Sequence, residues 1–358
     1  DVYKRQNPTC TPTRASLITG LHSVQTDVFE PGDNLADSEL SIQHYLEAEL
    51  PGTYANAVIG KWHISRQNDL DHPAQLGVQY FAGNLSGTFE NYNDWVLTIN
   101  GAQSDSTEYM TSKYVDLSLD WLASQDQPWF LWLAMNAPHE PFHLPPEHLH
   151  TQELSGTEED IQANPVRYYA AMVEAMDTDI GRLLSEMDED ERENTLIIFL
   201  GDNGTPRRVI QGPYRNAQGK GSLYQGGINV PLFASGAGVS RRSQHEAALV
   251  SITDLFATIS EVAGIESAAD NQSTSFASLF SDAGTGNRQF VYSDGKDEEL
   301  DSWAVRDDRY KMIANEGGRL EVYDLLLDPF ENNDLVTSGT VPDGVLESLE
   351  TYAESIQQ

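Results

Sequence analysis

Short, mostly apolar runs recur along the first two thirds of the chain, and each ends at a glycine or a polar residue. The runs cover residues 54–59, 129–135, 195–200 and 230–234. Apolar residues occupy odd and even positions alike, which is typical of strands that are covered on both faces. The pattern therefore predicts strands buried inside a parallel sheet.

The segments between and after these runs carry apolar residues three or four positions apart, as amphipathic helices do. They cover residues 38–49, 109–123, 166–187 and 252–263, and Gly264 is a suitable end for the last of them. Strands that alternate with helices are typical of a doubly wound α/β fold. We therefore predict an α/β fold with a doubly wound, mostly parallel sheet.

The composition changes at residues 267–287, which are rich in Ser, Asp, Asn and Gly and predict a loop or a boundary. Beyond them, short strand-like segments are separated by turns, and a helix-like segment follows at 342–356. This pattern predicts a small C-terminal antiparallel sheet with a terminal helix. We expect an α/β domain over residues 1–285 and a C-terminal α+β subdomain over residues 286–358. The strand-like segments are 290–293, 302–306, 309–314 and 320–324.

The composition is strongly acidic but otherwise that of a folded protein. Of 358 residues, 39% are hydrophobic and 22% are charged, so we expect a sizeable core. With 21 Lys and Arg against 56 Asp and Glu, the net charge is 21 − 56 = −35, which repels nucleic acid phosphates and anionic membranes. We expect no nucleic acid or membrane partner, and a site for an anion must be locally basic. No stretch of about 18 apolar residues predicts a transmembrane helix.

Polar residues that can carry chemistry directly follow the predicted strands. Lys61 and His63 come after the first run, His139 after the second, and Asp202 and Asn203 after the third. In doubly wound sheets, ligands bind beyond the carboxyl ends of the strands. We therefore expect these five residues at a ligand site.

Each of these motifs also has an ordinary structural explanation. The carboxylate and amide oxygens of Asp202 and Asn203 suit a hard cation such as Ca²⁺ or Mg²⁺, but the same residues are common in turns. Lys61 and His63 can supply a charge and a proton donor, or can be a surface lysine and a packed histidine. Prolines on both sides of His139 stiffen its loop, which suits a general acid but also an ordinary loop histidine.

The glycine-rich segment 219–227 contains Lys220. Glycines allow the backbone to approach a ligand closely and leave the Lys220 side chain able to reach an anion. The alternative is a flexible loop. The glycine spacing before Lys220 is not that of a nucleotide-binding Walker loop.

Cys10 is the only cysteine of the chain, so it cannot form an internal disulfide. It lies two residues before Pro12 and four before Arg14, and a lone cysteine is either a small buried hydrophobic residue or a group kept for its chemistry. Together with the motifs downstream, this spacing resembles the type I sulfatases, the formylglycine-dependent branch of the alkaline phosphatase superfamily. The resemblance begins at Asn7 and covers nearly the whole chain.

The resemblance implies a sulfuric ester hydrolase in which Cys10 is oxidised to formylglycine (3-oxoalanine). The hydrate of formylglycine would supply the nucleophilic hydroxyl and contact a divalent metal, and Arg14 would hold it in place. Asp202 and Asn203 would ligate the metal, for which Ca²⁺ is expected first and Mg²⁺ second.

The resemblance also implies roles for the basic residues. Lys61 and Lys220 would bind sulfate oxygens. His63 would bond to the second hydroxyl of the hydrate and help to expel sulfate, and His139 would bind the bridging oxygen and help to protonate the leaving alcohol. Two lysines, an arginine and a divalent cation provide the fixed positive field that a sulfuryl-transfer transition state needs.

The resemblance further implies a formylglycine-generating enzyme as the maturation partner and a periplasmic or secreted location. Residues 1–6 join the cysteine motif abruptly, and no signal peptide is recognisable there, so we exclude them from the fold prediction. The family's metal site also uses two adjacent aspartates on a strand upstream of the cysteine motif, whereas nine residues precede Cys10 here. We therefore expect this chain to bind metal poorly and to be less active than a form that includes such a strand.

Two other functions are compatible with the same motifs. Relatives with a similar cysteine motif hydrolyse phosphonate or phosphate esters, and an inactive relative could serve as a carbohydrate-binding protein. We expect an organic sulfate ester as the substrate, with a sulfated oligosaccharide as the leading candidate. Six residues could line its pocket or could equally be ordinary packing or surface residues: Trp62, Arg66, His72, Trp95, His143 and Arg215.

Overall fold

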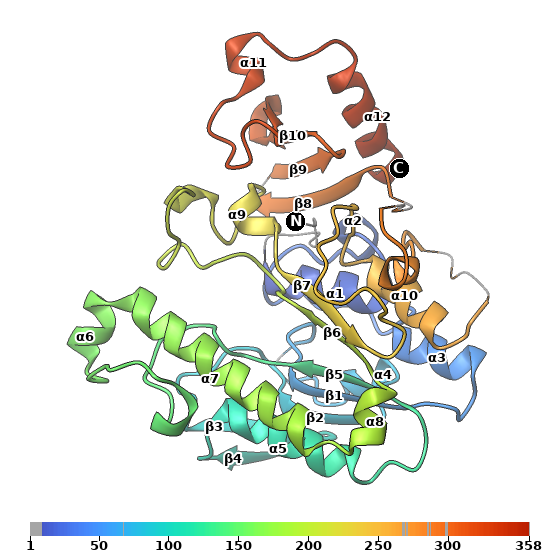
Figure 1. Ribbon diagram of the computed structural model, residues 1–358, viewed down its shortest axis with the longest axis vertical. Coiled ribbons are helices and arrows are strands. Elements are labelled where there is room, and N and C mark those ends of the chain that lie inside the picture. The colour runs from blue at the N-terminus through green and yellow to red at the C-terminus, as the bar shows by residue number, and fades with distance from the viewer. Residues whose placement is uncertain are drawn as a thin grey trace. The chain divides into compact units, whose positions relative to one another are not determined.

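The computed structural model describes residues 9–66, 68–266, 269, 271–284, 286, 288–297 and 300–357 (Figure 1). Asn7 and residues 1–6, discussed above, lie outside the described residues, as do parts of segment 267–287. The chain forms two compact units, which we describe separately. One is Asp37–Thr195, and the other combines Asp1–Ala36 with Leu196–Gln358.

The unit Asp37–Thr195 is built on a five-stranded sheet with the order β4-β3-β2-β1-β5. The central strand β1 (Ala55–Lys61) is buried along its whole length and pairs in parallel with β2 (Tyr80–Asn84) and β5 (Trp129–Ala134). Strands β3 (Trp95–Ile99) and β4 (Ala102–Ser106) add an antiparallel hairpin at one edge. The first two predicted strands and their parallel pairing are therefore confirmed.

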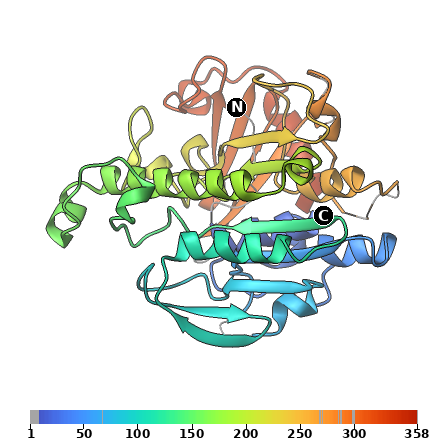
Figure 2. The ribbon, with the colours of Figure 1, turned by 60° about the horizontal axis from the view of Figure 1, so that its bottom comes forward.

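Helices cover this sheet in two layers. Helix α5 (Met110–Leu122) packs on β1 and β2, and α7 (Pro165–Glu186) packs on α5, as Figure 2 shows. The predicted helices at 38–49, 109–123 and 166–187 are confirmed by α3 (Ile42–Glu49), α5 and α7. The remaining helices of the unit are α4 (His72–Gln75), η1 (Glu147–Leu149), α6 (Glu158–Ala163) and α8 (Glu189–Glu193).

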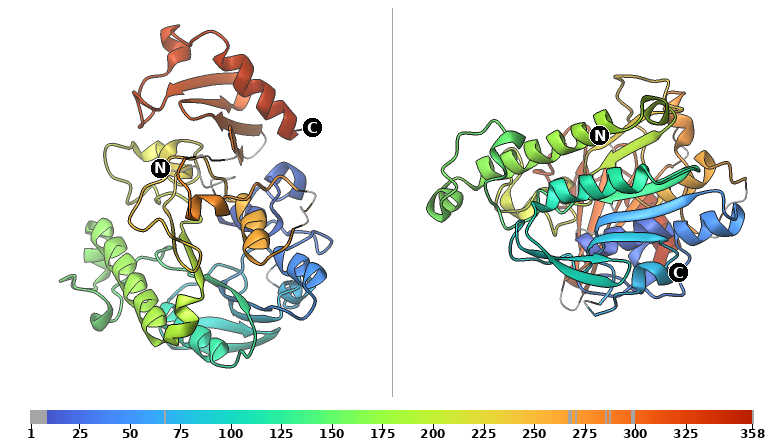
Figure 3. Two further views of the ribbon diagram at one scale, coloured as in Figure 1. Left: turned by 45° about the vertical axis from the view of Figure 1, so that its right-hand side comes forward. Right: turned by 90° about the horizontal axis from the view of Figure 1, so that it is seen from below.

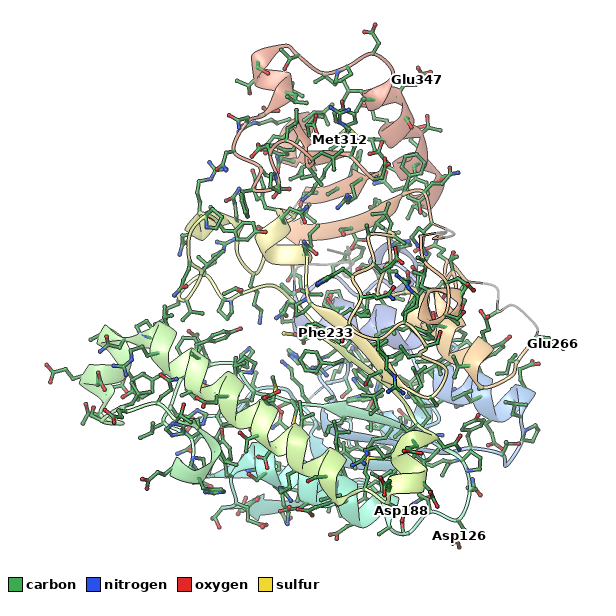
Figure 4. The ribbon with its side chains drawn as sticks, viewed as in Figure 1. Asp126, Asp188, Phe233, Glu266, Met312 and Glu347 are labelled. Atoms are coloured by element: carbon green, nitrogen blue, oxygen red, sulfur yellow. The ribbon has the colours of Figure 1, made fainter. Side chains whose placement is uncertain are left out.

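In the second unit, the other two apolar runs form a separate pair of strands. Strands β6 (Leu196–Leu200) and β7 (Leu232–Gly236) pair antiparallel, with Leu196 opposite Gly236. All of β6 is half-buried, and Phe233 of β7, labelled in Figure 4, is 64% exposed. The prediction of a parallel, fully buried setting for these two runs is therefore wrong. An apolar run predicts a strand but contains no information on the direction of its partner.

Helix α1 (Cys10–Thr19) is buried along its whole length and packs against α10 (Asp254–Val262), which confirms the helix predicted at 252–263. Gly20 ends α1 with a left-handed φ of 71°, and its N–H donates to Ser16 O at 3.0 Å. A Cβ atom on Gly20 would lie 2.5 Å from Asn271 Nδ2, so the site also needs the small residue for space. The other short helices are α2 (Ser23–Thr26), η2 (Asn216–Gln218), α9 (Gln225–Ile228) and η3 (Ala277–Phe280).

The predicted C-terminal antiparallel sheet and terminal helix are confirmed (Figure 3, left). The sheet has the order β11-β10-β9-β8. One face packs through Met312 and Val322 against Leu349 of the terminal helix. The other face packs through Ile313 against Leu223, in the glycine-rich segment. Its elements are β8 (Val291–Asp297), β9 (Leu300–Arg306), β10 (Tyr310–Asn315), η4 (Glu316–Gly318), β11 (Arg319–Asp324), α11 (Leu335–Ser338) and α12 (Val345–Gln357).

Within the described ranges, no helix is long and apolar enough to span a bilayer. The compact units place residues 196–285 with the C-terminal sheet. The division at residue 285 stays a prediction.

Candidate active site

Cys10 is the first residue of α1, and Arg14 lies four positions later on the same helix. Residues four apart lie on one face of a helix, so both side chains point to the same side of α1. Both are 4% exposed. Both side chains therefore lie on one side of the buried helix α1.

The structure brings Cys10 together with residues about 200 positions away. The thiol of Cys10 donates to Asn203 Oδ1 at 3.1 Å. Lys220 Nζ donates to Cys10 Sγ at 3.4 Å. Arg14 Nη2 lies 3.3 Å from Asp202 Oδ2, so all five predicted residues of this unit converge on the start of α1.

The turn that carries Asp202 and Asn203 directly follows β6 and is packed against the glycine-rich segment. Gly204 N–H donates to Gly227 O at 3.0 Å, and a Cβ atom on Gly204 would lie 2.0 Å from Gly226 O. Lys220 N–H donates to Thr205 O at 2.9 Å. Glycines at this junction permit the close backbone approach that places Lys220 beside the turn.

The local charge at Cys10 is positive, in contrast to the acidic chain as a whole. The side chains around the thiol include two cations, Arg14 and Lys220, and one carboxylate, Asp202. Asp202 is partly exposed, with 32% of its side-chain surface accessible. The described side chains next to the thiol thus hold one more positive than negative charge.

The oxygen atoms beside Cys10 are of the type that a hard cation prefers, because Asp202 offers a carboxylate and Asn203 an amide. Ca²⁺ usually takes about six to eight oxygen ligands. Within the described part of the chain, no group of three or more His, Cys, Asp or Glu side chains is placed to hold a metal ion. Asp202 and Asn203 therefore suit part of a cation site.

The remaining predicted residues belong to the unit Asp37–Thr195. Lys61 is the last residue of β1, is 2% exposed and stands opposite Asn84 of β2. His63 follows with a left-handed φ of 59°, and a Cβ atom on Gly87 would lie 2.3 Å from its Cγ. Both residues thus lie at or just beyond the carboxyl end of the central strand, as predicted.

His139 lies in the loop after β5, and hydrogen bonds hold both its backbone and its ring. Its N–H donates to Asn136 O at 2.9 Å, and its carbonyl accepts from the Tyr92 hydroxyl at 2.9 Å. Its Nδ1 lies 2.7 Å from Glu140 O. Because a carbonyl can only accept, Nδ1 carries a proton, and Nε2 is the nitrogen that can gain or lose one.

Sequence reasoning missed the two tyrosines that surround this loop. The ring of His143 lies on that of Tyr92, with centroids 4.2 Å apart, and its Nε2 lies 3.1 Å from the Tyr109 hydroxyl. Burial lowers the pKa of His143. Tyrosines at 92 and 109 follow no recognisable motif, so no signal in the sequence could have found them.

Three of the six predicted pocket-lining residues are core residues instead. Trp62 and His72 are fully buried and bonded to each other, with Trp62 Nε1 donating to His72 Nδ1 at 3.0 Å. Trp95 is 4% exposed, and its Nε1 donates to Glu108 O at 3.0 Å. For these three the alternative of ordinary packing holds, because a large aromatic ring close to a strand packs favourably into the core.

Comparison with known families identifies two matching models. The model described as Sulfatase matches residues 3–265. The model described as N-sulphoglucosamine sulphohydrolase, C-terminal, matches residues 218–357. Together they cover nearly the whole chain.

The individual relatives share about a quarter of their residues with this chain. N-acetylgalactosamine-6-sulfatase of Homo sapiens is 25% identical over 305 residues, which are 74% of this chain and 55% of the relative. Arylsulfatase G of Rattus norvegicus is 24% identical over 367 residues, 87% of this chain and 67% of the relative. The chain thus spans little more than half the length of the first of these relatives.

Solved structures share the fold. The structure of BT4656 in complex with its substrate D-glucosamine-2-N,6-O-disulfate has a TM-score of 0.81, 18% identity, and coverage of 100% of this chain and 89% of that one. The structure of Ps i-CgsB in complex with k-i-k-neocarrahexaose has a TM-score of 0.81, 22% identity, and coverage of 99% and 86%.

Proposed function

The chain belongs to the sulfatase family, and from this premise we propose that it hydrolyses sulfate monoesters of carbohydrates through residue 10. The observation that carries the proposal is the convergence of Lys220, Asn203 and the Arg14–Asp202 pair on Cys10. A lone structural cysteine would need none of these polar neighbours, because a buried thiol packs as a small hydrophobic residue.

We propose that Cys10 is oxidised to formylglycine by a formylglycine-generating enzyme. Formylglycine supplies a hydrated aldehyde, of which one hydroxyl can attack sulfur while the other allows sulfate to be released without water attacking sulfur. The S–O bond to the sugar breaks in the first half, and the C–O bond to sulfate breaks in the second. In the first half, the attacking hydroxyl gives up a proton and the leaving sugar oxygen takes one. In the second half, the remaining hydroxyl gives up its proton as the aldehyde re-forms, and addition of one water then restores the hydrate.

The basic residues stabilise the charge that moves onto oxygen in this reaction. Lys220, whose Nζ lies 3.4 Å from Cys10 Sγ, would contact non-bridging sulfate oxygens, and Arg14 would hold the hydrate. We propose that Lys61 is the second sulfate-binding lysine. His63 would take the proton of the second hydroxyl, and His139, in its doubly protonated form, would give its Nε2 proton to the leaving sugar oxygen.

A divalent cation would polarise the sulfate and offset the negative charge that develops on the oxygens at residue 10. Ca²⁺ is the first candidate for this cation and Mg²⁺ the second. Asp202 and Asn203 would contribute to its site. The substrate is proposed to be a sulfated carbohydrate, which the sulfated sugar bound to the solved relative and the N-acetylgalactosamine-6-sulfatase relative support. A periplasmic or extracellular location follows from the family expectation and is proposed with it.

The test combines a chemical and a kinetic measurement on protein produced with a formylglycine-generating enzyme. Mass spectrometry of the peptide that contains Cys10 should show the thiol replaced by an aldehyde. Hydrolysis of an aryl sulfate and of sulfated oligosaccharides should exceed that of the matched aryl phosphate. A Cys10→Ala variant is the control and should lose all turnover.

Two outcomes would contradict the proposal. Faster hydrolysis of the phosphate would identify a phosphate or phosphonate ester hydrolase. An unmodified Cys10 with measurable binding of a sulfated oligosaccharide and no turnover would identify a carbohydrate-binding protein.

A further inference from the structure

We propose that the buried ion pair of Lys311 and Glu331 positions Lys220 against residue 10. Lys311 lies on β10 of the C-terminal sheet, and Glu331 follows β11, so neither belongs to the motifs that carry the chemistry. The inference rests on the proposed function, in which Lys220 contacts the sulfate group. Lys311 and Glu331 would be positioning residues that never touch the substrate.

The pair is fully enclosed. Lys311 Nζ lies 2.5 Å from Glu331 Oε1, and both side chains are 0% exposed. Burial lowers the pKa of Lys311 and raises that of Glu331, and the attraction between the two groups opposes both shifts. Buried charges are expensive unless they are paired and hydrogen-bonded, and such pairs are often replaceable by apolar residues without loss of stability. Stability alone therefore does not explain this pair.

The remaining hydrogen bonds of the pair hold the backbone just after Lys220. Lys311 Nζ donates to Leu223 O at 2.5 Å. Glu331 Oε2 accepts from Gln225 N–H at 2.6 Å. Two backbone groups within five residues of Lys220 are thus bound to one ion pair.

The backbone of the same acidic residue holds the segment just before Lys220. Arg215 Nη2 donates to Glu331 O at 3.1 Å. Gln218 Nε2, in η2, donates to Phe330 O at 2.9 Å and to Glu331 O at 3.3 Å. Glu331 has a left-handed φ of 56°, which a residue with a side chain adopts only where its surroundings require it. Glu331 therefore makes hydrogen bonds to residues on both sides of Lys220, before it and after it in the chain.

The contacts of Glu331 and Lys311 restrict the glycine-rich segment that carries Lys220. The segment around Lys220 is rich in glycine and would be mobile without external contacts. Lys220 Nζ nevertheless must stay beside Cys10 Sγ, at 3.4 Å in this structure. A displacement of about 1 Å in a catalytic group can cost on the order of a hundredfold in rate. The ion pair supplies the rigidity that the segment itself lacks.

The test uses the full chain and a double variant, Lys311→Met with Glu331→Gln, because either single change leaves a buried charge unpaired. The amide introduced at position 331 can still accept from Gln225 N–H, whereas Leu223 O loses its donor. We expect hydrogen exchange of the amides in 219–227 to rise, with α1 unchanged. The control is Arg309→Ala, which removes the Arg309–Asp324 pair at 2.7 Å on the same sheet and should leave exchange in 219–227 as it is.

A double-mutant cycle with Lys220→Ala distinguishes positioning from general stability. We expect the Lys311/Glu331 variant to lower kcat/KM for the sulfate ester at least about tenfold in the parent chain. In the Lys220→Ala background, the same double variant should lower kcat/KM by less than about twofold. A purely structural role would lower kcat/KM equally in both backgrounds and would overturn the proposal.

Hydrogen exchange can be measured without substrate. The positioning role of the ion pair and the proposed sulfatase function can therefore be contradicted independently of each other. Unchanged exchange in 219–227 overturns the positioning role even if the chain is a sulfatase. Raised exchange in a chain with no sulfatase activity supports the contact to the segment and overturns the proposed function instead. If the double variant does not fold, the same measurements are made on Gln218→Ala, which removes the donor to Phe330 O and one of the two donors to Glu331 O.

Discussion

Lys220 donates a hydrogen bond to the thiol of Cys10 across a separation of 210 residues. The contact joins a glycine-rich segment to the first turn of a buried helix. A cation beside residue 10 favours a negatively charged group there, whether a sulfate or a developing oxyanion.

Replacement of Lys220 tests the electrostatic role directly. Lys220→Ala should lower kcat/KM for an aryl sulfate by about a hundredfold or more, because a fixed positive charge beside the transferring group is lost. Lys113→Ala, which removes a lysine paired at the surface with Glu108, is the matched control and should leave kcat/KM unchanged. Equal losses in both variants would show that Lys220 has no special role.

The cation site can be tested by titration. Asn203→Ala should raise the Ca²⁺ concentration needed for half-maximal activity about tenfold or more, because an oxygen ligand is removed. A chelator should abolish activity of the parent chain, and added Ca²⁺ should restore it. Asp126→Asn changes a carboxylate outside the site and should not alter the titration. Activity that is indifferent to the chelator would exclude the proposed cation.

Acid sensitivity is expected from His22. Its side chain is fully buried, and neither ring nitrogen has a hydrogen-bond partner within the described residues. Burial, together with the charge of Arg288, lowers the pKa of His22 from 6.5 to about 3. The folded protein therefore keeps the ring neutral, while the unfolded chain takes up a proton as the pH falls below 6.5.

The unfolded state thus binds more protons, and stability falls as the pH drops from 6.5 towards 3. At pH 5, this one residue should cost about 2 kcal/mol relative to pH 7. Urea unfolding should show that the free energy of unfolding differs less between pH 7 and pH 5 for His22→Phe than for the parent chain. His148→Gln, at an exposed position, should behave like the parent chain, and the same pH difference in His22→Phe would refute the assignment.

The glycine junction at the site should not accept a side chain. Gly204→Ala should lower both stability, by about 1–3 kcal/mol, and activity, because its Cβ atom would meet Gly226 O at 2.0 Å. Gly181→Ala is the control, since that helical glycine has open space around it and alanine is the better helix former. Thermal unfolding and aryl sulfate hydrolysis should distinguish the two variants, and a stable, fully active Gly204→Ala would contradict the close packing.

The parts of the fold that depend on local patterns followed from the sequence. Helical spacing predicted α5, α7 and α10, and the run that ends near Lys61 predicted the buried central strand β1. The same reasoning failed for β6 and β7, because strand direction depends on which segment pairs with which. The sequence also left open whether Trp62 lines a pocket or packs in the core, because the neighbours that bury a residue come from elsewhere in the chain.

By itself, the sequence determined the chemistry that is available, because the types and spacing of Cys10, Pro12 and Arg14 resemble a sulfatase motif. That Cys10 and Arg14 share one face of a helix was seen only in the structure. Only the tertiary structure decided that Lys220 and Asn203 meet that thiol, and that Lys311 and Glu331 hold the segment of Lys220. The physical reason is that the pattern of apolar and polar residues along a segment depends on the burial and the backbone preference of that segment alone. Contacts across some two hundred residues arise instead from the packing of whole elements.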